Sequence, residues 1–303
     1  MNSKIIIILF LAFSFNAMAK LKVITTTTDI AWLAQRIGGE KVEVESLLNG
    51  TEDPHYIDAM PHFIAKAANA DIFCMVGLDL EVGWAPKILT RSGNRKIQPG
   101  GKGYCETGKT VKALDVPTGK IDRSHGDVHP QGNPHYHLGP TAFLQGAETV
   151  LNVLIDIDSK NAAYYLNNFE NTKKDINKLK SKIANQLKNV KNLKFMEYHR
   201  EFSYFLNEFG ISNIGAIESV PGVPPSAGRL ARVSIEAKQK GVSLALAATT
   251  SPKNLTDKFQ EMSGIHVSRV PISIEKEGKV KTYEDLLSYI AKDILENAKV
   301  KAK

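Results

Sequence analysis

The sequence has few cysteines and lacks the short motifs of several common catalytic sites. Its 303 residues include only two cysteines, Cys74 and Cys105, whose spacing is not that of a zinc-binding pair. It contains no Walker A loop, G-x-G-x-x-G turn, G-x-S-x-G elbow or H-E-x-x-H pair. These absences leave a nucleotide-binding enzyme, a serine hydrolase and a zinc peptidase of the H-E-x-x-H type without support.

Long apolar runs are also missing, except near the N-terminus. Lys4 is followed by an apolar run that ends at Phe13, and an A-x-A cleavage signal ends at Ala19. The run is short for a membrane span. We therefore expect residues 1–19 to be a signal peptide cleaved after Ala19, and the mature protein to be soluble in a bacterial periplasm. No cysteine lies directly after the expected cleavage site, so we expect no lipid anchor on the mature N-terminus.

The formal net charge of +7 comes mainly from lysines, many of them on helix-like stretches such as residues 173–182. No aromatic residues alternate with these lysines, so we interpret the stretch as a solvated helix face and expect no nucleic-acid partner. We also expect a monomer. Export permits a disulfide between Cys74 and Cys105, but Cys74 lies in an apolar run where a buried free thiol is common. The sequence leaves both states open.

Strand-like and helix-like segments alternate along the mature chain, which is typical of an α/β fold with parallel sheets covered on both faces. The strand candidates are residues 21–25, 42–48, 71–77, 193–198, 213–217, 243–247 and 266–270. The helix candidates are residues 30–37, 62–70, 141–155, 202–209, 227–240, 252–262 and 283–298. We expect two Rossmann-like lobes.

A helical pattern without Gly or Pro covers residues 158–189. A helix of ~30 residues is ~45 Å long, enough to join two lobes rather than pack inside one. The sequence therefore predicts an N-terminal lobe at 20–157, a rigid linking helix at 158–189 and a C-terminal lobe at 190–303. Residues 99–135 are rich in Gly, Pro and polar side chains, and they predict a long loop.

Half of the eight histidines lie within thirteen residues, at His125, His129, His135 and His137. Imidazole is the commonest nitrogen ligand of zinc, so this density indicates a metal site. Outside the segment, His55 repeats the Pro-His pattern of His135.

His55, His135 and His199 each lie at or beyond the carboxyl end of a strand-like segment, where parallel sheets bind ligands. We expect the three side chains to face one cleft between the lobes. His137 is a further candidate because strand-like alternation would turn it to the same side as His135.

Three stretches together resemble the TroA-like zinc/manganese solute-binding proteins of ABC transporters, of the zinc-uptake type. They are Asp53-Pro54-His55, Asn133-Pro134-His135 and Tyr198-His199 followed by Phe202. The resemblance covers essentially the whole mature chain. It implies two lobes bridged by a rigid helix, metal held between them by three histidines (His55, His135 and His199), and delivery of the metal to an ABC permease in the inner membrane. A periplasmic metallochaperone is a further candidate partner.

The ligand types favour Zn²⁺ over Mn²⁺. His199 stands where manganese-preferring members typically carry a carboxylate, and imidazole suits zinc better than the oxygen-seeking manganese. The positions near Ala247 and Ile272, acidic in many members, are not acidic here. The fourth ligand therefore stays open between water, His137, a histidine of the 125–129 loop, and Glu218.

Several of these residues have alternative roles. His125 and His129 form either a metal-capture loop or a solvated loop. Asp53 and Glu218 either orient the histidine rings or cap turns.

The leading hypothesis is a periplasmic binding protein that captures Zn²⁺ and is not an enzyme. One alternative is a zinc-dependent hydrolase, since three histidines and a water also describe catalytic zinc, although no paired base is evident. Another is a zinc-binding adhesin or storage protein.

Overall fold

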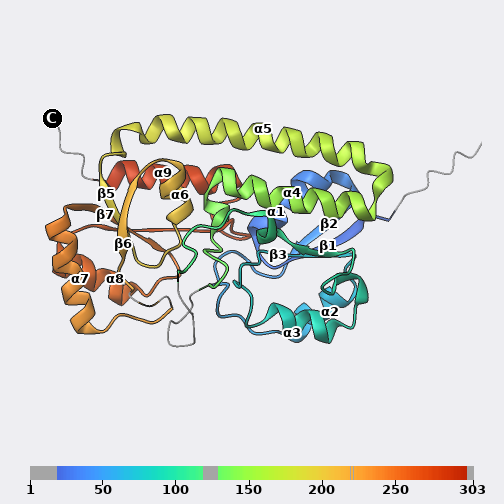
Figure 1. The fold of residues 1–303 in the computed structure, drawn as a ribbon, viewed down its shortest axis with the longest axis horizontal. Helices are drawn as coiled ribbons and strands as arrows, with labels where there is room; N and C mark the ends of the chain where they lie inside the picture. Colours follow the sequence, from blue (N-terminus) through green and yellow to red (C-terminus); the bar gives the residue numbers. More distant parts are fainter. Residues whose placement is uncertain (1–18, 119–128, 219, 221, 299–303) are drawn as a thin grey trace, which may run out of the picture.

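The structure is a computed structural model that describes residues 19–118, 129–218, 220 and 222–298 (Figure 1). The predicted signal peptide, apart from Ala19, and His125 lie outside the described residues. Among the helices of the described part, none is both long enough and apolar enough to span a bilayer.

The first lobe is built on a four-stranded parallel sheet with the order β2-β1-β3-β4. Its strands are β1 (Leu21–Thr25), β2 (Val42–Ser46), β3 (Ile72–Met75) and β4 (Tyr104–Glu106). Helices α1 (Thr28–Gly38) and α4 (Pro140–Ile157) cover one face, and α2 (Pro61–Ala68) and α3 (Ala85–Ser92) cover the other (Figure 1). Parallel strands need such crossover helices, which bury both faces of the sheet.

The second lobe repeats this plan with the order β6-β5-β7-β8. Its strands are β5 (Lys194–Glu197), β6 (Ser212–Ala216), β7 (Val242–Ala248) and β8 (Val267–Val270). Helices α7 (Ala227–Lys240) and α8 (Lys253–Ser263) cover one face, and α6 (Ser203–Glu208) and α9 (Tyr283–Asn297) lie on the other. The predicted α/β fold with two parallel sheets is confirmed.

Helix α5 (Ala162–Gln186) runs along both lobes (Figure 1). Short 3-10 turns continue it at Ser159–Asn161 and Leu187–Val190. Its buried side chains include Phe169, Ile176 and Ile183, and they belong to one apolar core that extends from α1 to α9. Because this core is continuous beneath α5, the helix is packed against both lobes and is not a free linker.

The prediction of a long loop over residues 99–135 is wrong at β4. This three-residue strand pairs in register with β3, and a disulfide joins Cys74 to Cys105 across the pair, with a Cα–Cα distance of 4.3 Å. A strand of three residues is too short to show an alternating sequence pattern, so β4 can be recognised only by its pairing with β3. Helix α3 was also not expected from the sequence.

Candidate metal centre

The structure brings His55, His135 and His199 together between the lobes. One possible ligand atom from each lies within 4.8 Å of the other two. The ring centroids are 5.2 Å apart for His55 and His135, 5.6 Å for His55 and His199, and 5.7 Å for His135 and His199. His55 lies in the loop after β2, His199 follows β5, and His135 precedes the turn that leads into α4. The site therefore has two walls, one from each lobe.

His55 is oriented by the carboxylate two residues before it. Asp53 Oδ1 accepts the backbone N–H of His55 at 3.0 Å and lies 2.7 Å from its Nδ1. Burial opposes ionisation of Asp53, but the hydrogen bond and charge of His55 outweigh it and lower the pKa of the carboxyl. The indole N–H of Trp84 fixes the turn by donating to the Pro54 carbonyl at 2.8 Å. This arrangement leaves Nε2 of His55 available to a metal.

His199 has the same kind of support in the second lobe. Its Nδ1 lies 2.9 Å from Oε2 of Glu218, and that oxygen also accepts the backbone N–H of Gly222 at 3.1 Å. Glu218 follows β6, and its own N–H donates to the Tyr198 carbonyl at 3.1 Å. A carboxylate on one ring nitrogen fixes the orientation of the ring and leaves the other nitrogen free to bind a metal. Glu218 thus lies behind His199 in this arrangement.

His135 is held differently. It is 2% exposed, its backbone N–H donates to Asn133 Oδ1 at 2.9 Å, and its buried Nε2 has no hydrogen-bond partner among the described residues. Burial, followed by the nearby histidines, places its pKa well below the usual value. Buried polar atoms are normally paired, so an unpaired nitrogen that keeps its lone pair fits a metal ligand.

His129 lies beside this group without belonging to the set of three. Its Nε2 is 3.2 Å from Nε2 of His55. Burial, followed by the charges of His55 and His199, lowers the pKa of His129 to about 3, while a ring N–H bonds to the backbone of Asp79. Asp79 has a φ of 64°, a left-handed conformation on the turn after β3. This turn therefore directs the carbonyl that orients His129.

His137 does not join the cluster. The segment Tyr136–Leu138 is a 3-10 turn, so the strand-like alternation expected for His137 is wrong. Its ring centroid lies 6.4 Å from that of His135, and its Nε2 is 2.6 Å from the Ile272 carbonyl. Tyr283 also donates to the His137 carbonyl at 2.8 Å. His137 therefore connects the first lobe to the segment that follows β8.

Glu201 is a buried carboxyl near the centre that sequence reasoning missed. It is 6% exposed, and its Oε2 has no hydrogen-bond partner in the part of the chain that the structure describes. Burial, followed by the negative charge of Asp53, raises the pKa of Glu201 to about 8, and His55 and Glu218 also act on it. Its position two residues after His199 could have indicated that Glu201 lies near the site.

A polar clasp, formed by Asp115, Asn133 and Arg200, links the two walls. Arg200 Nη1 donates to Asp115 Oδ1 at 3.2 Å, and Asn133 Nδ2 donates to Asp115 Oδ2 at 3.0 Å and to the Arg200 carbonyl at 2.6 Å. Asn133 lies two residues before His135, and Arg200 directly follows His199. The clasp therefore ties together the segments that carry one histidine from each lobe.

Known proteins show similarity over nearly the whole chain. Residues 23–297 match the family model of zinc-uptake complex component A, periplasmic (ZnuA). The zinc-binding lipoprotein AdcA of Streptococcus pneumoniae is 24% identical over 296 residues, which cover 92% of this chain and 55% of AdcA. The manganese ABC transporter substrate-binding lipoprotein PsaA of the same species is 26% identical over 203 residues, which cover 65% of this chain and 62% of PsaA. The chain thus spans little more than half the length of these relatives.

Solved structures share the fold. A crystal structure of ZnuA has a TM-score of 0.75 at 20% identity, covering 92% of this chain and 99% of that chain. The solute-binding protein FpvC of Pseudomonas aeruginosa, in complex with Mn²⁺, has a TM-score of 0.76 at 21% identity, covering 92% and 98%. With the family model matched over residues 23–297, the chain belongs to the ZnuA family of periplasmic zinc-uptake components.

Proposed function

We propose that this chain binds Zn²⁺ through His55, His135 and His199 in the periplasm and delivers it to an ABC importer of the inner membrane. The observation that carries the proposal is the group of three histidine nitrogens, all within 4.8 Å of one another. The ion is cargo here, and the protein holds it without chemical change.

Zinc is favoured over manganese by the donor set. Relatives are named for each metal, so the family alone does not choose between them. The three grouped residues offer imidazole nitrogens, whereas the nearby carboxylates Asp53 and Glu218 are engaged with ring nitrogens. Imidazole suits zinc, and manganese prefers carboxylate and water oxygens.

We infer that His129 is the fourth ligand. Two nitrogens bound tetrahedrally to zinc at about 2.0 Å are about 3.3 Å apart. The 3.2 Å separation of the His129 and His55 Nε2 atoms is close to this spacing. His137 and Glu218 are less suitable, because each is engaged elsewhere in a hydrogen bond.

The lobes would act as two walls that move little. We propose domains at 20–157 and 190–303, a linking helix at 158–189, a monomeric state and no catalytic role. The periplasmic location rests on the signal peptide predicted for residues 1–19.

Metal titration of residues 20–303 against a competing chelator tests the binding step. We expect one tightly bound Zn²⁺ per chain and weaker binding of Mn²⁺, with tight binding lost after combined substitution of the three histidines by alanine. His62→Ala is a matched control because His62 is exposed on α2. Tighter binding of Mn²⁺, or tight zinc binding by the triple variant, would contradict the proposal.

Zinc uptake by cells that lack this gene tests the delivery step. The wild-type chain should restore growth in zinc-limited medium, and His199→Ala should not. Equal rescue by both would exclude delivery through this site.

A further inference from the structure

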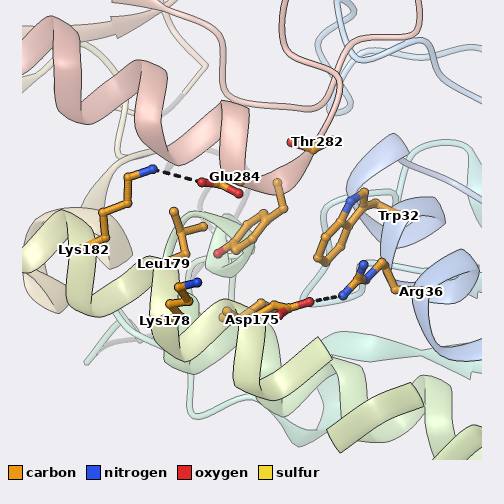
Figure 2. Close-up of a pocket in the computed structure, with 10 residues that line it drawn as sticks. Trp32, Arg36, Asp175, Lys178, Leu179, Lys182, Thr282 and Glu284 are labelled. Atoms are coloured by element: carbon orange, nitrogen blue, oxygen red, sulfur yellow. Dashed lines mark hydrogen bonds and ion pairs between the residues drawn. The ribbon is translucent and has the colours of Figure 1, made fainter. Parts of the chain in front are cut away.

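A groove lies where α1, α5 and α9 meet, and its lining shares no residue with the metal centre (Figure 2). Its volume is about 600 Å³, within the range of sites that hold small molecules. Helix α1 belongs to the first lobe, α9 to the second, and α5 runs along both. Small-molecule sites commonly lie at such junctions.

One side of the groove is apolar and packed into the core. Trp32, Leu179 and Tyr283 line it, and the Trp32 and Tyr283 rings are 5.5 Å apart. Trp32 is half-buried, whereas Tyr283 and Leu179 are buried. The Arg36 guanidinium lies 5.6 Å from the centroid of the Trp32 ring. These contacts hold the indole in place, so the wall is formed before any ligand arrives.

The rim carries charges that are unevenly paired. Arg36 pairs with Asp175 at one end, and Lys182 pairs with Glu284 at 3.0 Å at the other (Figure 2). Lys178 lies between them on α5 and has no ion-pair partner within the described part of the chain. Of the charged lining residues, three are cations and two are anions. The groove thus has an unmatched positive charge beside an apolar wall.

Its length limits the size of a ligand. Asp175 and Lys182 are seven residues apart on α5, which is about 10 Å along a helix axis. A molecule of one or two rings fits between the two ion pairs.

We propose that this groove binds a small planar carboxylate, with its ring against Trp32 and Leu179 and its carboxylate at Lys178. The apolar wall contributes burial of the ring, and Lys178 selects the charge. A cationic ligand would be repelled by the excess positive charge of the groove, and a neutral ring would form no ion pair with Lys178. The bound molecule would contact both lobes and α5. The inference does not depend on the proposed zinc transport.

NMR titration of residues 20–303 with 2-naphthoate, without added metal, tests the proposal. The chain has two tryptophans, so two indole N–H signals report separately on two places. Trp32 lines the groove, and Trp84 is buried and donates to the Pro54 carbonyl. We expect a saturable shift of the Trp32 signal and none of the Trp84 signal. Trp84→Phe assigns the two signals.

Two controls separate recognition of the carboxylate from general ring binding. Lys178→Gln should weaken 2-naphthoate binding about threefold to fivefold, as expected for an exposed ion pair. Lys174→Gln, an exposed lysine one turn earlier on α5 and outside the groove, should leave it unchanged. The neutral 2-naphthamide should bind more weakly than 2-naphthoate, and its affinity should be the same for the wild-type protein and Lys178→Gln.

Three results would overturn the proposal. One is the absence of a saturable shift of the Trp32 signal. Another is an equal effect of the two lysine substitutions. The third is equal binding of the amide and the carboxylate.

Discussion

His199 and His135 lie on opposite walls of the candidate metal centre and are held there by different means. His199 has a carboxylate partner, Glu218, and its side chain is 14% exposed. Within the described residues, His135 has no such partner on Nε2, and it is buried. A carboxylate fixes a ring by hydrogen bonding, whereas burial keeps a ring neutral by excluding water.

The comparison teaches that one site can prepare its ligands in two ways. His55 follows the pattern of His199, because Asp53 holds its Nδ1 at 2.7 Å. Substitutions on the two walls should therefore differ in what they change. Loss of a carboxylate should leave the histidine ring in front of it less well oriented. Loss of His135 should in addition change how the free energy of unfolding depends on pH.

The largest effect should come from removing a ring. His135→Ala and His199→Ala should each lower zinc affinity by more than ~100-fold, beyond the range found for groups that only support a ligand. Chelator competition measures this, with His62→Ala as the control. A loss below ~10-fold at either position would mean that the centre does not need both walls.

Removing a supporting carboxylate should have the next largest effect. Glu218→Ala and Asp53→Ala should each lower zinc affinity by ~10- to 100-fold, because the ring behind each is no longer oriented. Glu218→Gln keeps an acceptor oxygen and should recover part of the loss. Unchanged affinity in Glu218→Ala would show that burial alone positions His199, as it does His135.

Acid should destabilise the metal-free protein through His135. Burial, followed by the neighbouring histidines, places its folded pKa well below the 6.5 of a free histidine. Below about pH 6.5 the unfolded chain takes up a proton that the folded chain does not, so the free energy of unfolding falls as the pH is lowered. Urea titrations at about pH 5 and about pH 7 should show this decrease.

The decrease with acid should be smaller in His135→Ala than in His62→Ala. Equal decreases in the two variants would remove the distinction between the two walls.

The smallest effect is expected at the clasp between the walls. Arg200 and Asp115 are partly exposed, so their ion pair should contribute at most about 1 kcal/mol. Asp115→Ala and Arg200→Ala should each speed zinc release by no more than ~5-fold, and the double variant should add little to either. Stopped-flow measurement of zinc release into a chelator gives the rate for the two single variants and the double variant. Fully additive effects on the release rate would show that the ion pair does not couple the walls.

The regular elements were largely predictable because their patterns are local. Helix α7 occupies 227–240 as expected, and β1 occupies 21–25. The region of α5 was evident from a long stretch without Gly or Pro. The grouping of the three histidines was also predicted. His55 and His199 follow strands as expected, whereas His135 lies in the segment between β4 and α4.

Apart from helix α3, the misses concern contacts between distant segments. Strand β4 exists through its pairing with β3, and the disulfide follows from the same register. His137 turns toward Ile272 of the other lobe, which no alternation rule could show. The unpaired oxygen of Glu201 is a property of its burial.

The sequence by itself determined the three imidazoles of the candidate site, the parallel α/β pattern and the long helix between the halves. Only the tertiary structure decided which ring nitrogens are engaged and which are left for a metal. Glu218 lies behind His199, and His129 comes beside His55. The physical reason is that residue types and local periodicity are properties of short segments. Burial and hydrogen-bond partners arise only when segments far apart in the chain are packed together.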